Sequence, residues 1–195
     1  MNPKQNATDR LVDEACLALG EVGLTGLTIG LIAERARVST ALIHYHFDTK
    51  ARLLVASAER IAARRAGARS AALSARTGLD ALDDLWIQII AGVTEGIERA
   101  WLELVLWARA EPEVAAALAA PQPAARAQIA RRLPMLLREL GATPHANSEE
   151  LAAALDAQLD GLTLALLGGQ EPAAVRTAYD AFWLTLIAAA PTRRR

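Results

Sequence analysis

The sequence contains few of the residues from which disulfides, metal centres and membrane spans are built. Among its 195 residues there is one cysteine, there are three histidines, and aromatic residues make up 4%. The single Cys16 excludes an internal disulfide and is typical of a protein in the reducing cytoplasm. No apolar run reaches the roughly 18 residues of a membrane span. The polar start MNPKQNATDR lacks the apolar core of a signal peptide, so we expect a cytoplasmic protein.

The histidines do not form a metal-binding pattern. Chelation from a helix needs ligands three or four residues apart, because only that spacing places them on one face. His44 and His46 are two residues apart, about 200° around a helix, and His145 lies in a distant polar segment. We therefore expect neither a metal nor another cofactor.

Motifs of catalytic and nucleotide-binding sites are also missing. The sequence has no GxSxG turn, no glycine-rich phosphate loop and no GxGxxG. Ser39 and Thr40 are close in sequence to His44, but they are better placed as helix caps or surface contacts. Asp156 and Asp160 share one helix face, as solvated or structural pairs commonly do. We expect no catalytic residue and no enzyme activity.

The apolar residues follow a helical pattern. Hydrophobic residues make up 53% of the chain and charged residues 22%, which is typical of a globular protein. Apolar positions recur three and four apart, glycine and proline separate the segments, and no alternating strand pattern appears. The sequence predicts an all-α protein with a small N-terminal unit and a larger helical body. The predicted helices span residues 8–22, 29–35, 40–46, 50–69, 79–97, 99–109, 112–140 with a break near Pro121 and Pro123, 148–167 and 172–189.

The stretch VSTALIHYHFDTK, residues 38–50, has the pattern of a helix-turn-helix. Two short helices joined by a three- or four-residue turn can place the second helix in the major groove of DNA. Ala33 provides a small residue at the helix crossing, and Val38 is an apolar residue that closes the turn. Three further apolar residues anchor the second helix inward, namely Leu42, Ile43 and Phe47.

The outward residues of this motif predict a DNA-contacting surface. Hydroxyl, imidazole, phenol and methyl groups can meet base edges, thymine methyls and phosphate oxygens, and capped helix N-termini can hold phosphates. Residues 1–69 also hold ten Lys or Arg against seven Asp or Glu, while residues 70–195 hold eleven against fifteen. The predicted contacts are Thr28, Ser39, Thr40, Ala41, His44, Tyr45, His46 and Lys50. For His46, packing beneath the helix and phosphate contact fit the pattern equally well.

The segment TIGLIAERARVSTALIHYHFDTKARLL resembles the signature of the TetR family of transcriptional regulators, and RLVDEACLALGEVGLTGLT resembles the family's opening stretch. Helix lengths, cap positions, the HF pair and the following lysine coincide over the first quarter to third of the chain. The resemblance implies a three-helix DNA-binding domain at residues 1–50. It also implies a helical effector-binding and dimerisation domain at residues 51–195, and a dimeric repressor released by a small molecule.

The sequence departs from the family pattern at several positions. Arg37 stands where a glycine is usual, so Arg37 must adopt the conformation of that glycine or the turn must shift. Arg37 can also add a phosphate contact, and we include it among the predicted DNA-binding residues. His44 replaces a common tyrosine, while Gly30 and Leu31 replace polar residues and remove the acidic partner of a capping box.

Three of the four tryptophans fall in the two helices predicted after residue 78. Each tryptophan taken alone is most simply a core residue. Taken with the family resemblance, Trp86, Trp101, Glu103 and Trp107 are predicted to line an aromatic effector pocket, in which Glu103 would attract a cationic ligand.

The last two predicted helices are apolar over much of their circumference. A terminal helix of a monomer usually has a broad polar face, so this pattern predicts a homodimer through a four-helix bundle. A two-fold dimer would read a palindromic operator. The alternative function is a helical protein-interaction module without sequence-specific DNA binding. Salt distinguishes the two, because phosphate contacts weaken steeply as salt rises.

Overall fold

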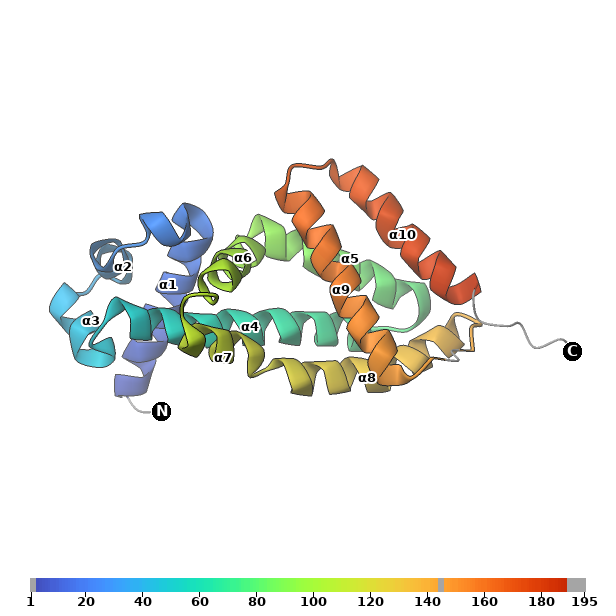
Figure 1. Ribbon diagram of the computed structural model, residues 1–195, viewed down its shortest axis with the longest axis horizontal. Helices are drawn as coiled ribbons and strands as arrows, with labels where there is room; N and C mark the ends of the chain where they lie inside the picture. Colours follow the sequence, from blue (N-terminus) through green and yellow to red (C-terminus); the bar gives the residue numbers. More distant parts are fainter. Residues whose placement is uncertain (1–2, 144–145, 189–195) are drawn as a thin grey trace, which may run out of the picture. The chain divides into compact units, whose positions relative to one another are not determined.

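The computed structural model describes residues 3–143 and 146–188, so His145 lies outside the described part of the chain. Within these residues the structure contains helices and no strand, which confirms the predicted all-α class (Figure 1). The helices are α1 (Pro3–Gly26), α2 (Ile29–Ala36), α3 (Thr40–Phe47), α4 (Lys50–Ala75), α5 (Gly78–Thr94), α6 (Ile97–Trp107), α7 (Pro112–Ala119), α8 (Gln122–Glu139), α9 (Ser148–Leu167) and α10 (Pro172–Ala188).

The chain packs into two compact units that divide within α4. The first unit comprises Met1–Arg65 and Thr94–Gln122, and the second comprises Ala66–Val93 and Pro123–Arg195. Helices α1, α2, α3, α6 and α7 therefore belong to the first unit, while α9 and α10 belong to the second. The predicted functional boundary at residue 50 is a different division, and it stays a prediction.

Hydroxyl side chains cap the three helices that follow α1. The hydroxyl of Thr28 accepts a hydrogen bond from the backbone N–H of Leu31 at 3.1 Å, and Ser39 Oγ accepts one from Leu42 at 3.2 Å. Thr49 Oγ1 accepts one from Arg52 at 3.2 Å. Each bond satisfies an N–H that has no partner in the first turn of a helix. These three caps fix where α2, α3 and α4 begin.

Helix α1 bends at the glycine that the sequence predicts as its end. Gly23 has φ 70° and ψ 178°, outside the helical region, and a further turn follows it up to Gly26. A positive φ is accessible to glycine because it has no Cβ. The polar N-terminal residues from Pro3 onward extend the helix beyond the predicted start at residue 8.

Helix α4 is longer than the sequence predicts. Residues 70–75, which lie between the predicted helices 50–69 and 79–97, continue α4 as far as Ala75. Alanine and leucine are strong helix formers, and this intrinsic preference extends the helix. The break between α5 and α6 falls at Gly96, which has φ 78°, rather than after residue 97.

The core of the first unit depends on a close approach of α1 and α6. A Cβ atom added to Gly20 would lie 2.7 Å from the carbonyl oxygen of Gly96, so neither position has room for a side chain. Ala18 and Leu19 of α1 and Ala100 and Leu104 of α6 are fully buried in the same apolar cluster. This packing joins the helix that precedes the helix-turn-helix to residues nearly eighty positions later.

In the second unit, a buried arginine of α4 pairs with two carboxylates of α9. Arg69 Nη2 lies 2.9 Å from Asp160 Oδ1, and Arg69 Nη1 lies 3.8 Å from Asp156 Oδ1. Burial raises the pKa of Asp156 above its usual value, although Arg69 and Arg126 act in the opposite direction. The two aspartates therefore have a structural role, as the helix-face pattern suggests.

Candidate nucleic-acid interface

Helix α3 is held from one side by apolar residues. Ile43 and Phe47 are buried in the core of the first unit, and Val38 packs against that core from the turn. Leu42 is half-buried and is not part of the buried cluster, so its predicted role as a full inward anchor is wrong. Its place after two exposed residues in the first turn of α3 leaves one side of Leu42 uncovered. Two residues rather than three anchor this helix.

The opposite side of α3 is exposed. Thr40, Ala41 and His44 are exposed, and the Tyr45 side chain is 67% exposed. The Tyr45 ring lies edge-on to the ring of His46 at a centroid distance of 5.3 Å. Thr28, Arg37 and Ser39 are exposed as well. The described geometry therefore gathers hydroxyl, imidazole, phenol and guanidinium groups around a short capped helix, which suits the edges and phosphates of duplex DNA.

Besides the capping hydroxyls, three predicted contact residues bond within the chain, and for His44 the bond is local, with its Nδ1 3.1 Å from the backbone carbonyl oxygen of Asp48. His46 is half-buried, and its Nδ1 lies 3.1 Å from Thr8 Oγ1 on α1. The Lys50 ammonium donates to the backbone carbonyl of Leu27, just before α2. An ammonium has three donors, so Lys50 retains the capacity to meet a phosphate. His46 is placed between α1 and the exposed face of α3.

Arg37 adopts the conformation for which glycine is usual. Its φ is 54° and its ψ is 49°, in the left-handed region, and its backbone N–H bonds the carbonyl oxygens at the end of α2. The turn has therefore kept its geometry although it contains an L-residue. A left-handed residue with a Cβ costs roughly 1–2 kcal/mol.

We expect substitutions at Arg37 to change stability in opposite directions. Arg37→Gly removes the steric cost of the left-handed conformation, and it also increases the conformational entropy of the unfolded chain, which offsets part of the gain. The free energy of unfolding should therefore rise by about 0.5 kcal/mol. Arg37→Val should lower the free energy of unfolding by more than 1 kcal/mol, because β-branched residues avoid positive φ. Urea denaturation of the two variants tests this order. Equal stability of the glycine and valine variants would contradict it.

A second tight turn lies at the other end of α3. Asp48 has φ 62° and ψ −54°, and the backbone N–H of Thr49 donates to the carbonyl of Phe47 at 2.6 Å. This is a γ-turn, a rare conformation in which the chain reverses over three residues. Arg37 and Asp48 are the two non-glycine residues with positive φ in the described part of the chain. Arg37 ends α2, three residues before α3 begins, and Asp48 directly follows α3, so a residue with positive φ lies near each end of α3.

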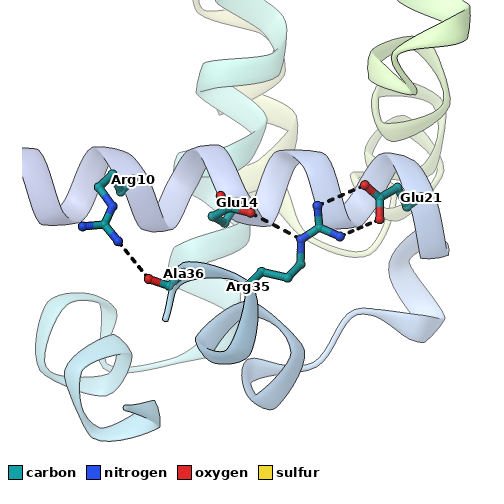
Figure 2. Close-up of polar contacts among 5 residues, drawn as sticks. All are labelled: Arg10, Glu14, Glu21, Arg35 and Ala36. Atoms are coloured by element: carbon teal, nitrogen blue, oxygen red, sulfur yellow. Dashed lines mark hydrogen bonds and ion pairs between the residues drawn. The ribbon is translucent and has the colours of Figure 1, made fainter. Parts of the chain in front are cut away.

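Arg35 fastens α2 to α1. Its guanidinium lies between two carboxylates of α1, with Nη1 2.5 Å from Glu21 Oε2 and Nε 3.3 Å from Glu14 Oε2 (Figure 2). One turn toward the start of α1, Arg10 Nη2 donates to the carbonyl of Ala36 at 2.8 Å. The hydrogen bond from Arg35 holds the pKa of Glu21 below its usual range. We call Arg35, Glu14 and Glu21 the α1–α2 clamp.

The clamp predicts a pH-dependent stability. Since the pKa of Glu21 is lower in the folded chain than in the unfolded chain, ionised Glu21 stabilises the fold above about pH 4.5. This contribution is lost as the pH falls through the lowered pKa. Glu21→Gln should therefore lower the free energy of unfolding at pH 7, and the difference from wild type should shrink at pH 3. Denaturant unfolding at both pH values measures it, with Glu34→Gln on the exposed side of α2 as control.

The structure places three further basic residues at or near the candidate interface that were not predicted from the sequence. Arg52 is exposed in the first turn of α4, two residues after Lys50. Its positive charge at a helix start, where the helix dipole disfavours cations, could have indicated an external anion. Arg10 and Arg35 position α2 through the contacts described above, and their partners lie too far away in sequence for spacing to indicate them.

The predicted effector residues fall in different units. Trp101, Glu103 and Trp107 lie on α6 in the first unit, whereas Trp86 lies on α5 in the second. The Arg65 guanidinium stands 4.7 Å from the centre of the Trp101 ring. Glu103 Oε2 accepts a hydrogen bond from the backbone N–H of Leu24 at 3.2 Å, next to the bend of α1. These residues thus have partners within the chain, and their contact with an effector stays a prediction.

Two general features of the described residues bear on the class of site. Within residues 3–143 and 146–188, no group of three or more histidine, cysteine, aspartate or glutamate side chains is placed to hold a metal ion. No described helix is long and apolar enough to cross a membrane.

Comparisons with known proteins show which sequences and folds this chain is similar to. Residues 11–57 match the sequence profile of the bacterial regulatory proteins, tetR family. A search among characterised protein sequences gave no match. The profile match covers α2, α3, the caps and the start of α4, which is the region of the candidate interface.

Several solved structures share the fold along nearly the whole chain. A transcriptional regulator from Rhodococcus sp. Rha1 has a TM-score of 0.71 and 21% identity, covering 94% of this chain and 97% of that chain. A TetR transcription regulator from Haloarcula marismortui ATCC 43049 has a TM-score of 0.68 and 20% identity, covering 94% and 98%. The multidrug binding protein EbrR, complexed with ethidium, has a TM-score of 0.65 and 24% identity, covering 95% and 99%. The profile match shows that residues 11–57 are similar to the tetR family of bacterial regulatory proteins, and these structures show that the chain has the same fold as several transcriptional regulators.

Proposed function

We propose that the chain is a homodimeric repressor that binds a palindromic operator and is released by a small-molecule effector. In this proposal residues 1–50 read DNA, and residues 51–195 bind the effector and form the dimer. The observation that carries the proposal is the exposed side of α3, backed by buried Ile43 and Phe47. A short helix with an apolar back and a polar front is what the major groove accepts.

The proposed contacts divide by chemistry. Thr40, Ala41, His44 and Tyr45 are exposed on α3 and would meet base edges and thymine methyls. Four other residues would hold phosphates, through capped helix N-termini or positive charge: Thr28, Arg37, Ser39 and Lys50. Half-buried His46 would mainly orient the Tyr45 ring from its place against α1, with a phosphate contact from its free edge. Phosphate contacts fix the register, while contacts to the bases give specificity.

The dimer would form through α9 and α10. Exposed small or apolar residues follow one face of α9, and a second exposed face of small residues follows α10. The two faces consist of Ala154, Ala157, Gly161 and Leu164 on α9 and of Ala174, Ala178, Ala181 and Thr185 on α10. Spacings of three and four place each set on one side of its helix, and small side chains permit close approach of a partner helix. Two copies would complete a four-helix bundle.

The effector part of the proposal is supported by the ethidium complex of EbrR, a protein with the same fold. Trp86, Trp101, Glu103 and Trp107 are the residues proposed to contact a ligand in this chain. Release requires the effector to bind one of two dimer states more tightly than the other. Helix α4 contributes residues to both units, so a shift of α4 would also move the helix-turn-helix.

Selection of bound sequences from random duplex DNA tests the proposal. We expect a palindromic motif whose half-sites are about 34–36 Å apart, the spacing at which a dimer meets successive major grooves. Affinity for that motif should fall steeply between 50 and 200 mM salt, with a slope set by the phosphates contacted. Recovery of no motif, together with binding that salt leaves unchanged, would favour a protein-interaction module instead.

A further inference from the structure

Helices α5 and α10 enclose a pocket in the second unit that the proposed function does not use. Its volume is about 350 Å³, at the lower end of the range of small-molecule sites. Most of its wall is apolar, and two wall residues, Leu79 and Leu184, are each 66% exposed. The apolar wall consists of Leu79, Leu82, Trp183, Leu184 and Ile187. Exposed leucines beside a hollow of this size favour an apolar ligand.

The charged part of the wall carries one net negative charge. Asp83 of α5 and Asp180 of α10 line the pocket together with Arg176. Arg176 Nη2 lies 2.6 Å from Asp83 Oδ1, and Arg176 Nε lies 2.8 Å from Asp180 Oδ1. One guanidinium thus bridges two carboxylates, and all three groups are partly exposed. The surplus carboxylate charge selects for a cation and against an anion.

Arg176 also contacts two aromatic rings that are not part of the pocket wall. Its guanidinium lies 5.6 Å from the centre of the Trp86 ring and 5.5 Å from the centre of the Tyr179 ring. Both distances are within the range of cation–π attraction. Tyr179 is buried and its hydroxyl donates to the carbonyl of Leu82 at 2.6 Å, so its ring is fixed in place. Two carboxylates and two aromatic rings therefore surround a cation that belongs to the chain itself.

The pocket lies away from the face proposed for dimerisation. At about 100° per residue, Arg176, Asp180, Trp183 and Ile187 share one side of α10. The exposed small residues of α10, from Ala174 to Thr185, lie on roughly the opposite side. A partner helix on that face would leave the pocket open.

We propose that this pocket binds an organic monocation with an apolar body. The charged end would lie against Asp83 and Asp180 in competition with Arg176, and the apolar body would lie between Leu79, Trp183 and Leu184. This binding is independent of the proposed DNA function, so the test measures it without DNA.

Isothermal titration calorimetry with two probes of equal apolar body tests the charge preference. Benzyltrimethylammonium should bind the full-length chain, and benzylsulfonate should not. Asp180→Asn should weaken cation binding about 5- to 10-fold, the loss expected for one charge contact at a partly exposed site. Asp80→Asn removes the same charge from an exposed position of α5 outside the pocket, and it should leave the affinity unchanged.

Arg176→Met gives the sharpest result, because the proposal predicts a gain. Removing the internal cation leaves both carboxylates without their counter-charge, so benzyltrimethylammonium should bind several-fold more tightly. If Arg176 only stabilised the fold, the same change would weaken binding or leave it unaltered, and either result overturns the proposal.

A second variant and a further measurement guard against loss of folding. Leu184→Asn changes an exposed wall residue with little effect on folding, and it should weaken cation binding several-fold. No heat of binding for the wild-type chain with millimolar benzyltrimethylammonium would overturn the proposal. The proposal would also be overturned if a second copy of the chain covered the pocket. In that case Asp180→Asn would change the dimer dissociation constant, and titration with the cation would give no heat.

Discussion

Replacing Tyr45 with alanine should weaken operator binding by about 30- to 1,000-fold per dimer. Tyr45 is 67% exposed on the outer side of α3, and each of two subunits would lose a contact worth roughly 1–2 kcal/mol. Its exposure also means that little of the fold depends on it, so the free energy of unfolding should change by less than about 0.5 kcal/mol. Fluorescence anisotropy with the selected operator and urea denaturation measure the two quantities.

Tyr45→Phe separates the phenol hydroxyl from the ring. If the hydroxyl contacts a base or a phosphate, Tyr45→Phe should lose most of the operator affinity that Tyr45→Ala loses. If the ring makes the contact by stacking or apolar packing, Tyr45→Phe should bind the operator like wild type. Leu106→Ala is the matched control, because Leu106 is similarly exposed on α6 of the same unit. Full operator affinity in Tyr45→Ala, with α3 still folded, would remove this residue from the interface.

If the proposed dimer forms through α9 and α10, Gly161→Arg should convert it to monomers at micromolar concentration and reduce operator affinity at least about 100-fold. Gly161 lies in the exposed small-residue face of α9, and a Cβ added there meets no atom of the chain within 4 Å. The fold of one subunit therefore has room for arginine, and replacing a helical glycine raises helix propensity. In a helix–helix interface the same side chain would bring a guanidinium against its own symmetry mate, without a counter-charge.

Gly67→Arg is the control for this change. Gly67 is an exposed glycine within α4, also with no atom within 4 Å of an added Cβ. It introduces the same charge and the same side chain on another helix. Sedimentation velocity should show a dimer for Gly67→Arg and a monomer for Gly161→Arg. Two dimeric variants would place the subunit interface elsewhere.

The local structure of the helix-turn-helix could be predicted from the sequence because each signal is local. Thr28, Ser39 and Thr49 are hydroxyl residues just before apolar periodic segments, and all three cap the helix that follows. Arg37 was expected either to take a left-handed conformation or to shift the turn, and it takes the former. The bounds of α3 differ from the prediction by one residue, at Phe47.

Features that join distant parts of the chain could not be predicted. The α1–α2 clamp pairs Arg35 with Glu14 and Glu21, and nothing in their spacing distinguishes them from other charged residues on helix surfaces. The pocket wall combines residues of α5 and α10 that are about a hundred positions apart. The sequence predicted an effector pocket at Trp86, Trp101, Glu103 and Trp107, which stays a prediction, but it did not indicate that Arg176 lies near the rings of Trp86 and Tyr179. Only the tertiary arrangement contains that information.

The contact of Gly20 with Gly96 sets a limit on exchanging modules between regulators. A chimera joined at residue 50 would combine α1 of this chain with α6 of another regulator. A side chain at the position of Gly96 would then clash with the backbone of α1. The proposed DNA-binding segment, residues 1–50, therefore cannot be exchanged alone. A functional graft must transfer the segments Met1–Arg65 and Thr94–Gln122 together, or else supply glycine at both ends of the crossing.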